Sequence, residues 1–237
     1  MTSRNPWPRD DSALRVALLT AHKDLRIEAR SRVLTNQVLP FSLIVLVMFA
    51  FALDSDAVLQ RVAPGLVWLA AVFSMLFMVS RAFAIETSDG ALDQLRSSGV
   101  SLSGIFVGKL IALFLQLMVL VVLLVGAAVV LYRAEVSWNA SVLLVTTAIT
   151  ATCGLAAVGT LYGGLAAGSK GRETLLPLLL LPVVAPVLIG ATRSTEAAFG
   201  TNGIGTSEGW PWCGLLAVFA VLFTVAGAIA FGPLIDE

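Results

Sequence analysis

The sequence has little charge for its length and almost none of the residues that build catalytic or redox centres. Only 13% of its 237 residues are charged and 58% are hydrophobic, whereas soluble domains carry about 25% charged residues. The single histidine, His22, rules out axial ligation of haem by a histidine pair within this chain. The two cysteines, Cys153 and Cys213, lie in or beside apolar runs without CxxC or CxxCH spacing, which favours free thiols over a metal or redox site. The low charge and the high apolar content predict a membrane protein. No catalytic triad can be assembled in the membrane, so we expect that the protein is not an enzyme.

Further absences narrow the class of membrane protein. The apolar runs contain no Asp, Glu or His of the kind that ion-coupled transporters need, which disfavours a secondary transporter. The stretch 104–110 has one residue too few for a phosphate loop and ends in Leu110, where Ser or Thr should bind magnesium. Gly104 and Gly108, like Gly159 and Gly163, are better explained as small residues that allow close helix packing. The formal net charge of zero argues against a nucleic-acid partner.

Six apolar runs are long enough, or nearly so, to cross about 30 Å of hydrocarbon, which takes roughly 20 helical residues. The first two are short and should extend at one end, and the third is long enough to tilt or protrude. The polar start has no apolar core followed by a cleavage site, so we expect the first span to remain in the mature protein. The sequence predicts an all-α integral membrane protein with an N-terminal segment, 1–36, and a six-span transmembrane domain, 37–237. The predicted spans are 38–53, 63–80, 102–132, 140–167, 174–192 and 211–234.

Lysine and arginine are unevenly distributed between the two sides of this topology. Twelve of the 15 fall on the side of the N-terminus, and the other side holds only Arg61, Arg133 and Arg193. The positive-inside rule therefore predicts that both termini are cytoplasmic. Lys109, the one charge within a span, is close enough to the cytoplasmic end to snorkel there. Four tryptophans lie near span ends and are expected to form an interfacial belt: Trp68, Trp138, Trp210 and Trp212.

The N-terminal segment has the pattern of an amphipathic helix. Its apolar residues recur at spacings of four and three and form one stripe: Leu14, Leu18, Ala21, Leu25 and Ala29. The basic residues that lie away from this stripe are Arg15, Lys23, Arg26 and Arg30. We expect the helix to lie on the inner leaflet, with its cations near anionic headgroups. A soluble helix packed on another subunit is the alternative.

The polar stretch SDGALDQLRSSG, residues 88–99, separates the second and third predicted spans. Its first serine or aspartate could cap a short helix, and its last glycine could adopt the left-handed conformation that ends one. Leu92 and Leu95 share one side of such a helix. The pattern predicts a short self-capped helix at about 88–98 on the cytoplasmic side of the membrane.

Several stretches between residues 24 and 192 resemble the CcmB family, the membrane subunit called haem exporter protein B of the cytochrome c maturation system. The more specific parts are APG-x-x-W at 63–68 and DG-x-L-[ED]-QL at 89–95. The stretches that carry the resemblance are DLRIEARSRVLTNQVLPFSLIVL, VAPGLVWLAAVFSMLF, RAFAIETSDGALDQLRSSGVSLSGIFVGKL and LLPLLLLPVVAPVLIGAT.

This resemblance implies a six-span permease of an ATP-binding-cassette (ABC) exporter type in the plasma (inner) membrane. It implies a separate cytoplasmic ATPase of the CcmA type, a CcmC-type haem-handling membrane protein and a CcmD-type small membrane peptide. A CcmE-type periplasmic haem chaperone would take part indirectly, released in its haem-loaded form with the help of ATP hydrolysis. ATP would be used by the partner, and haem would be a transported or handled ligand with no binding residue assigned in this chain.

In that family setting the short helix at 88–98 has the position of a coupling helix seated in a groove of the ATPase. Leu92 and Leu95 would provide an apolar anchor, charged neighbours would fix the orientation, and Gly90 would allow a tight turn. A solvated link helix without any contact is the alternative. The candidate ATPase-coupling residues are Glu86, Asp89, Gly90, Leu92, Asp93, Gln94, Leu95 and Arg96.

Two other functions remain open from the residues alone. The chain could be an ABC-type export permease for a lipid, glycan or drug, or a non-transporting membrane scaffold for haem-maturation proteins. A full cassette transporter needs two membrane halves, so we expect a homodimer or a heteromeric complex.

Overall fold

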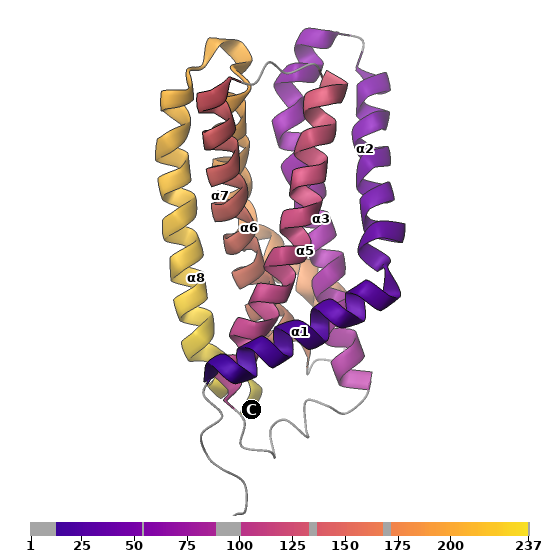
Figure 1. The fold of residues 1–237 in the computed structure, drawn as a ribbon, viewed down its shortest axis with the longest axis vertical. Helices are drawn as coiled ribbons and strands as arrows, with labels where there is room; N and C mark the ends of the chain where they lie inside the picture. Colours follow the sequence, from indigo (N-terminus) through magenta and orange to yellow (C-terminus); the bar gives the residue numbers. More distant parts are fainter. Residues whose placement is uncertain (1–12, 54, 89–100, 133–136, 168–171, 237) are drawn as a thin grey trace, which may run out of the picture.

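The computed structural model describes residues 13–53, 55–88, 101–132, 137–167 and 172–236, which are almost entirely helical and contain no strand. Six long helices stand side by side, and α1 lies obliquely across one end of the bundle, where the chain also finishes (Figure 1). We call this the α1 end. The elements are α1 (Ala13–Ser31), a π-helical turn (Leu34–Val38), α2 (Leu39–Ala52), α3 (Asp56–Ser88), α5 (Leu102–Tyr132), α6 (Trp138–Ala167), α7 (Arg172–Ala198), two 3₁₀ turns (Thr201–Gly203 and Thr206–Gly209) and α8 (Trp210–Asp236).

Among the described residues, six helices are long and apolar enough to cross a membrane, which confirms the six predicted spans. The third span matches α5 from end to end. The second is longer than the apolar run alone, because α3 starts at Asp56 and continues to Ser88. A helix can extend past the hydrocarbon layer at no cost in unpaired backbone groups, so hydropathy marks the membrane-crossing part and not the helix ends.

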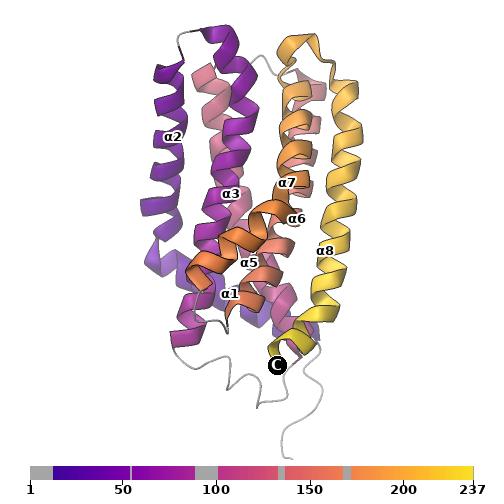
Figure 2. The same ribbon diagram turned by 180° about the vertical axis from the view of Figure 1, so that it is seen from behind.

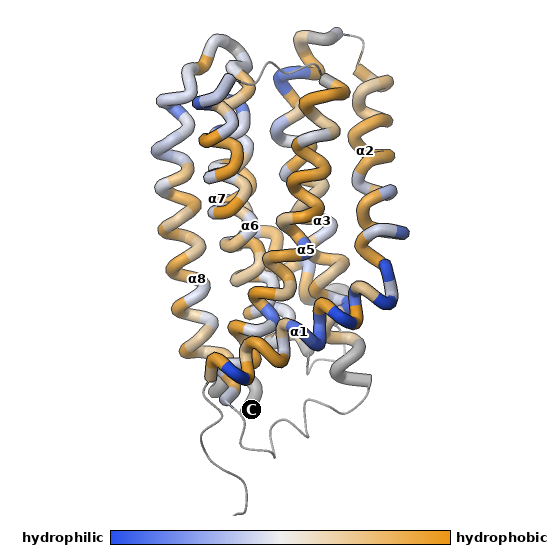
Figure 3. Tube along the Cα trace, viewed as in Figure 1, coloured by the Kyte–Doolittle hydropathy of each residue, from blue (hydrophilic) through white to orange (hydrophobic). Residues whose placement is uncertain are grey.

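The spanning helices differ in how deeply they are buried. In the most apolar stretches of α3 and α6, 72% and 61% of the residues are buried, compared with 17% in α2 and 22% in α8. The exposed side chains of α2 are large and apolar, among them Phe41, Met48 and Phe51, and the helix is coloured as hydrophobic along most of its length (Figure 3). An apolar outer surface on a polar-ended bundle is what contact with lipid requires.

Small residues set the distance between the central helices. A Cβ atom on Gly159 of α6 would lie 2.7 Å from the sulfur of Met75 on α3, and one on Gly163 would lie 2.5 Å from the ring of Phe83. Both glycines therefore hold α6 close to α3, as predicted from the sequence.

The helix α7 contains Pro177, Pro182 and Pro186 and is nevertheless continuous from Arg172 to Ala198. It is bent, with its first part inclined to the bundle and its last part upright (Figure 2). Each proline removes one backbone donor and so allows the bend.

The segment 193–209 is rich in Gly, Ser and Thr, a composition that predicts a flexible connector, and this prediction is wrong for most of its length. Arg193–Ala198 is the end of α7, and two 3₁₀ turns follow it. The buried Gly209 explains part of the order, because a Cβ atom there would lie 2.5 Å from Leu143 on α6. The polar composition suggested a loop, but it also suits a helix end at a membrane surface.

Candidate functional site

The junction of α1 with the bundle is the best-defined candidate site in the described residues. The buried side of α1 consists of Val16, Ala17 and Ala21, and α5 is the helix that it packs on most extensively. A Cβ atom on Gly104 would lie 2.7 Å from the carbonyl oxygen of Ala13, and one on Gly108 would lie 2.5 Å from that of Ala17. Gly104 and Gly108, whose spacing does not fit a phosphate loop, therefore form the surface on which α1 packs.

Replacing Gly108 with leucine should detach or displace α1. Overpacking of a close contact costs about 1–3 kcal/mol, and here the new side chain would meet the backbone of α1, which cannot rotate away. We expect a lower midpoint of thermal unfolding in detergent and faster tryptic cleavage within α1. Gly126→Leu on the same helix is the control, because a Cβ atom there meets nothing within 4 Å. Equal behaviour of the two variants would show that α1 does not depend on this contact.

The basic residues predicted to lie at the membrane surface are on α1 and exposed: Arg15, Lys23, Arg26 and Arg30. Leu14, Leu18 and Leu19 are exposed as well, at 74%, 66% and 60%. In the predicted stripe, Leu14 and Leu18 are exposed, whereas Ala21 packs against the bundle, so the prediction that Ala21 faces the lipid is wrong. The alternative of a helix packed on a separate subunit is not needed to explain the buried side, since this chain's own α5 covers it. The exposed leucines and arginines of α1 thus lie on the part of the helix that α5 does not cover.

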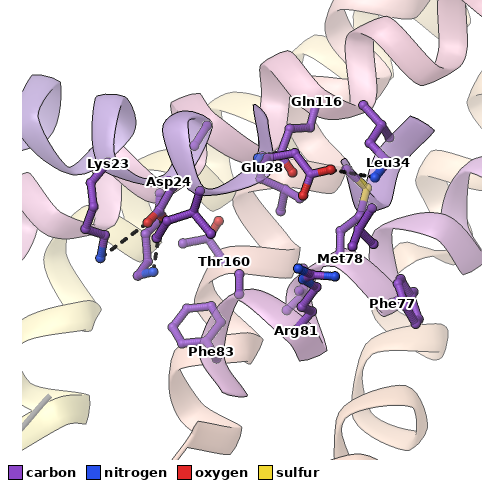
Figure 4. Close-up of a pocket in the computed structure, with 17 residues that line it drawn as sticks. Lys23, Asp24, Glu28, Leu34, Phe77, Met78, Arg81, Phe83, Gln116 and Thr160 are labelled. Atoms are coloured by element: carbon purple, nitrogen blue, oxygen red, sulfur yellow. Dashed lines mark hydrogen bonds and ion pairs between the residues drawn. The ribbon is translucent and has the colours of Figure 1, made fainter. Parts of the chain in front are cut away.

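Lys109 of α5 connects three helices. Its Nζ atom lies 3.3 Å from Oδ2 of Asp24 on α1 and 4.8 Å from the centre of the Phe83 ring on α3. Oδ1 of Asp24 lies 3.3 Å from Nζ of Lys23 (Figure 4). The side chain of Lys109 is only 4% exposed, so the prediction that it snorkels to the surface is wrong. The reason is that Asp24 provides a countercharge inside the protein, together with the face of an aromatic ring.

The chain turns from α1 into the first span through a short irregular connection. Arg32 adopts a left-handed conformation with φ 50°, and the backbone N–H of Leu34 donates a hydrogen bond to Oε1 of Glu28 at 2.5 Å. The carboxylate of Glu28 therefore caps the π-helical turn that precedes α2. This hydrogen bond ties the end of α1 to the start of the first span.

The predicted coupling segment, 89–96, lies outside the described residues. Of the candidate coupling residues only Glu86 belongs to a described helix, α3, and Ser88, one of the two possible caps, is the last residue of that helix. The end of α3 and the start of α5 at Leu102 both lie at the α1 end (Figure 1). The two helices that flank the segment are thus the two that Lys109 joins to α1.

The opposite end of the bundle holds a buried polar cluster that sequence reasoning missed. Nε1 of Trp68 on α3 donates a hydrogen bond to Oγ1 of Thr195 on α7 at 2.9 Å. The Thr147 hydroxyl lies 2.6 Å from the Ser194 hydroxyl and 3.2 Å from Sγ of Cys213. Trp68 is 1% exposed, so its assignment to an interfacial belt is wrong. Trp138 and Trp210 are exposed and Trp212 is half-buried, and their place in such a belt stays a prediction. These contacts join α3, α6, α7 and α8. The tryptophan of the APG-x-x-W motif, Trp68, is thus a buried contact between α3 and α7.

Metal chemistry finds no support in the described part of the chain, where no group of three or more His, Cys, Asp or Glu residues comes together. Cys153 is partly buried and Cys213 is buried, and neither forms a disulfide.

Comparisons with known proteins point to one family. The family described as "CcmB protein" matches residues 15–232. The chain is 32% identical over 213 residues to "Heme exporter protein B" of Haemophilus influenzae, covering 89% of this chain and 90% of that protein. It is 31% identical over 180 residues to the protein of the same description from Rhodobacter capsulatus, covering 75% and 82%. It is 29% identical over 211 residues to the one from Escherichia coli, covering 89% and 90%.

Proposed function

The chain belongs to the CcmB family, and from this premise we propose that it is the permease subunit of an ABC transporter complex required for cytochrome c maturation. The observation that carries the proposal is the family match, which runs from α1 through all six spanning helices. The relatives are described as heme exporters, and haem is accordingly the ligand that we propose the complex handles. No residue of this chain is assigned to haem.

The proposed energy source is a separate cytoplasmic ATPase of the CcmA type that docks at 86–96. Movement of this segment would act on α3 and α5, which flank it, and would reach α1 through Lys109 and Asp24. The helices that receive the motion are therefore linked by charge and by close glycine contacts at one end of the bundle.

The proposed partners follow from the family. They are a CcmC-type haem-handling protein, a CcmD-type membrane peptide and, indirectly, a CcmE-type periplasmic chaperone, whose haem-loaded form would be released on ATP hydrolysis. The exposed cations of α1 support an inner membrane location with both termini in the cytoplasm.

Deletion of the gene in its host, followed by complementation from a plasmid, tests the maturation role. We expect covalent c-type cytochrome to be lost in the deletion strain and restored by the plasmid, while non-covalent haem proteins of the membrane keep their haem. Haem staining of denaturing gels measures the first, and difference spectra of membranes measure the second. Unchanged c-type cytochrome would contradict the proposal and favour export of a lipid, glycan or drug.

An ATPase partner that assembles but cannot hydrolyse ATP separates a permease from a scaffold. If the chain works as a permease, cells with the inactive ATPase should lack c-type cytochrome although the complex purifies intact. A scaffold would need only assembly, so normal cytochrome in these cells would overturn the transport mechanism while leaving the maturation role in place.

A further inference from the structure

A cavity of about 70 Å³ lies beneath α1, between α1, α3 and α5. The helix α1 contributes Lys23, Asp24 and Glu28 to its lining, and the spanning helices contribute Arg81, Lys109, Gln116 and Thr160 together with apolar side chains such as Phe77 and Phe83 (Figure 4). Its positive charges are Lys23, Arg81 and Lys109, and its negative charges are Asp24 and Glu28. The lining therefore has one more positive than negative charge.

Both carboxylates of the cavity are already engaged. Asp24 contacts the ammonium groups of Lys23 and Lys109, and Glu28 accepts hydrogen bonds from the backbone of Leu34 and the hydroxyl of Ser31. Arg81 is half-buried and has no hydrogen bond or ion pair to any described residue. A guanidinium presents a planar fork of donors that fits a phosphate, and an anion in the cavity would satisfy it.

Two grooves adjoin this cavity and share lining residues with it. One, of about 410 Å³, lies between α2 and α3 and is lined by Val38, Phe41, Phe73 and Phe77, the last of which also lines the cavity. The other, of about 520 Å³, lies between α1, the π-helical turn and α5 and shares Glu28, Leu34 and Gln116 with the cavity. Its lining is mixed: Leu25, Ala29, Leu34, Leu115 and Val119 are apolar, and Glu28, Arg32, Thr35, Asn36 and Gln116 are charged or polar. A charged cavity beside two grooves that each offer apolar side chains matches the division of a phospholipid into one headgroup and two acyl chains.

We propose that this cavity and its two grooves bind a glycerophospholipid, with the phosphodiester at Arg81 and one acyl chain in each groove. The level of the site supports a lipid over a soluble ligand, because the surface helix α1 covers the charged cavity and the apolar side chains of both grooves extend onto membrane-spanning helices. Basic pockets between spanning helices are a known way to hold lipid headgroups. The bound lipid would fill the space under α1 and support its contact with α3 and α5.

The test compares lipid retention by the wild type and by Arg81→Gln with native mass spectrometry. The protein is purified in detergent, delipidated and titrated with phosphatidylglycerol or phosphatidylethanolamine, both with the same acyl chains. Loss of a charge-assisted bidentate contact should weaken binding by about tenfold or more for both lipids. Arg30→Gln is the matched control, because it removes an exposed arginine from α1 without touching the cavity. Equal weakening in both variants would show general attraction to cations and overturn the site.

A second measurement on the wild type does not depend on the folding of a variant. Phosphatidylglycerol with a photoreactive acyl chain should cross-link to the part of α3 that contains Phe73 and Phe77, and excess unlabelled phospholipid should suppress this product. Inorganic phosphate should not suppress this product; if it does, the cavity takes a free anion and the lipid assignment is wrong. Cross-links spread evenly over the outer face of α8 and α2 would also overturn the proposal, because they indicate bulk lipid only.

Discussion

A chain that carries Leu92→Asp together with Leu95→Asp should insert in the membrane, lose its ATPase on purification and leave cells without most of their covalent c-type cytochrome. The two leucines are the only large apolar residues of SDGALDQLRSSG, so they are the part of it that can bury surface in a partner. Burial of one leucine contributes about 1.5–3 kcal/mol. Exposing two of them, and placing two charges in their pocket, should weaken the contact by roughly 100-fold or more.

Co-purification of the tagged chain with its ATPase measures this effect, and haem staining of the same cells measures the consequence. Ser97→Asp with Ser98→Asp is the matched control, since it adds the same two charges to the same segment and keeps both leucines. Retention of the ATPase by the leucine variant, with normal cytochrome, would contradict the coupling role of 86–96. Retention of the ATPase with loss of cytochrome would mean that the segment matters in a later step than docking.

The positions of the spanning helices could be predicted because they depend on a local property. A run of about 20 apolar residues crosses the bilayer whatever surrounds it, and the six described spans agree with the six predicted ones. Helix ends depend on other forces. The extension of α7 to Ala198 follows from the packing of the segment after it, where Gly209 approaches Leu143, and nothing in the local composition indicates that contact.

The contacts of single polar residues could not be predicted, because their partners are distant in the sequence. Lys109 and Asp24 are 85 residues apart, and Trp68 and Thr195 are 127 apart. Lys109 could equally have reached the membrane surface, and only the position of α1 decides the matter. Gly104 and Gly108 were correctly interpreted as small residues that allow close helix packing. The sequence did not indicate that the helix packed against them is α1.

The structure joins these separate observations at the α1 end. The glycines bring α1 within backbone contact of α5, and this close approach places Asp24 over Lys109. Lys109 in turn lies against Phe83 of α3, the ring on which Gly163 of α6 also packs. A surface helix is in this way tied to three spanning helices, two of which flank the proposed ATPase contact.

The loss of stability should depend on which partner of the ion pair between Asp24 and Lys109 is removed. Asp24→Asn leaves an ammonium that is 4% exposed without its carboxylate, and breaking a buried pair costs about 3–5 kcal/mol. Lys109→Met should cost clearly less, because Asp24 is 15% exposed and keeps Lys23 at 3.3 Å. The double variant Asp24→Asn/Lys109→Met should recover much of the stability lost in Asp24→Asn, since no buried charge is then left behind.

Thermal unfolding in detergent, together with the rate of tryptic cleavage in α1, orders these three variants against the wild type. The coupling energy from the double-variant cycle is the quantity that decides, because a purely structural loss at two independent sites would be additive. Glu208→Gln, at the opposite end of the bundle, is the control, because it removes an exposed charge and surface substitutions usually change stability by no more than about 0.5 kcal/mol. Additive effects, or a double variant less stable than Asp24→Asn, would show that Lys109 and Asp24 do not hold α1 on the bundle as a pair. If instead the double variant is stable yet fails to restore c-type cytochrome, the charges themselves serve the transport cycle, because packing would then be intact while the link between α1, α3 and α5 is lost.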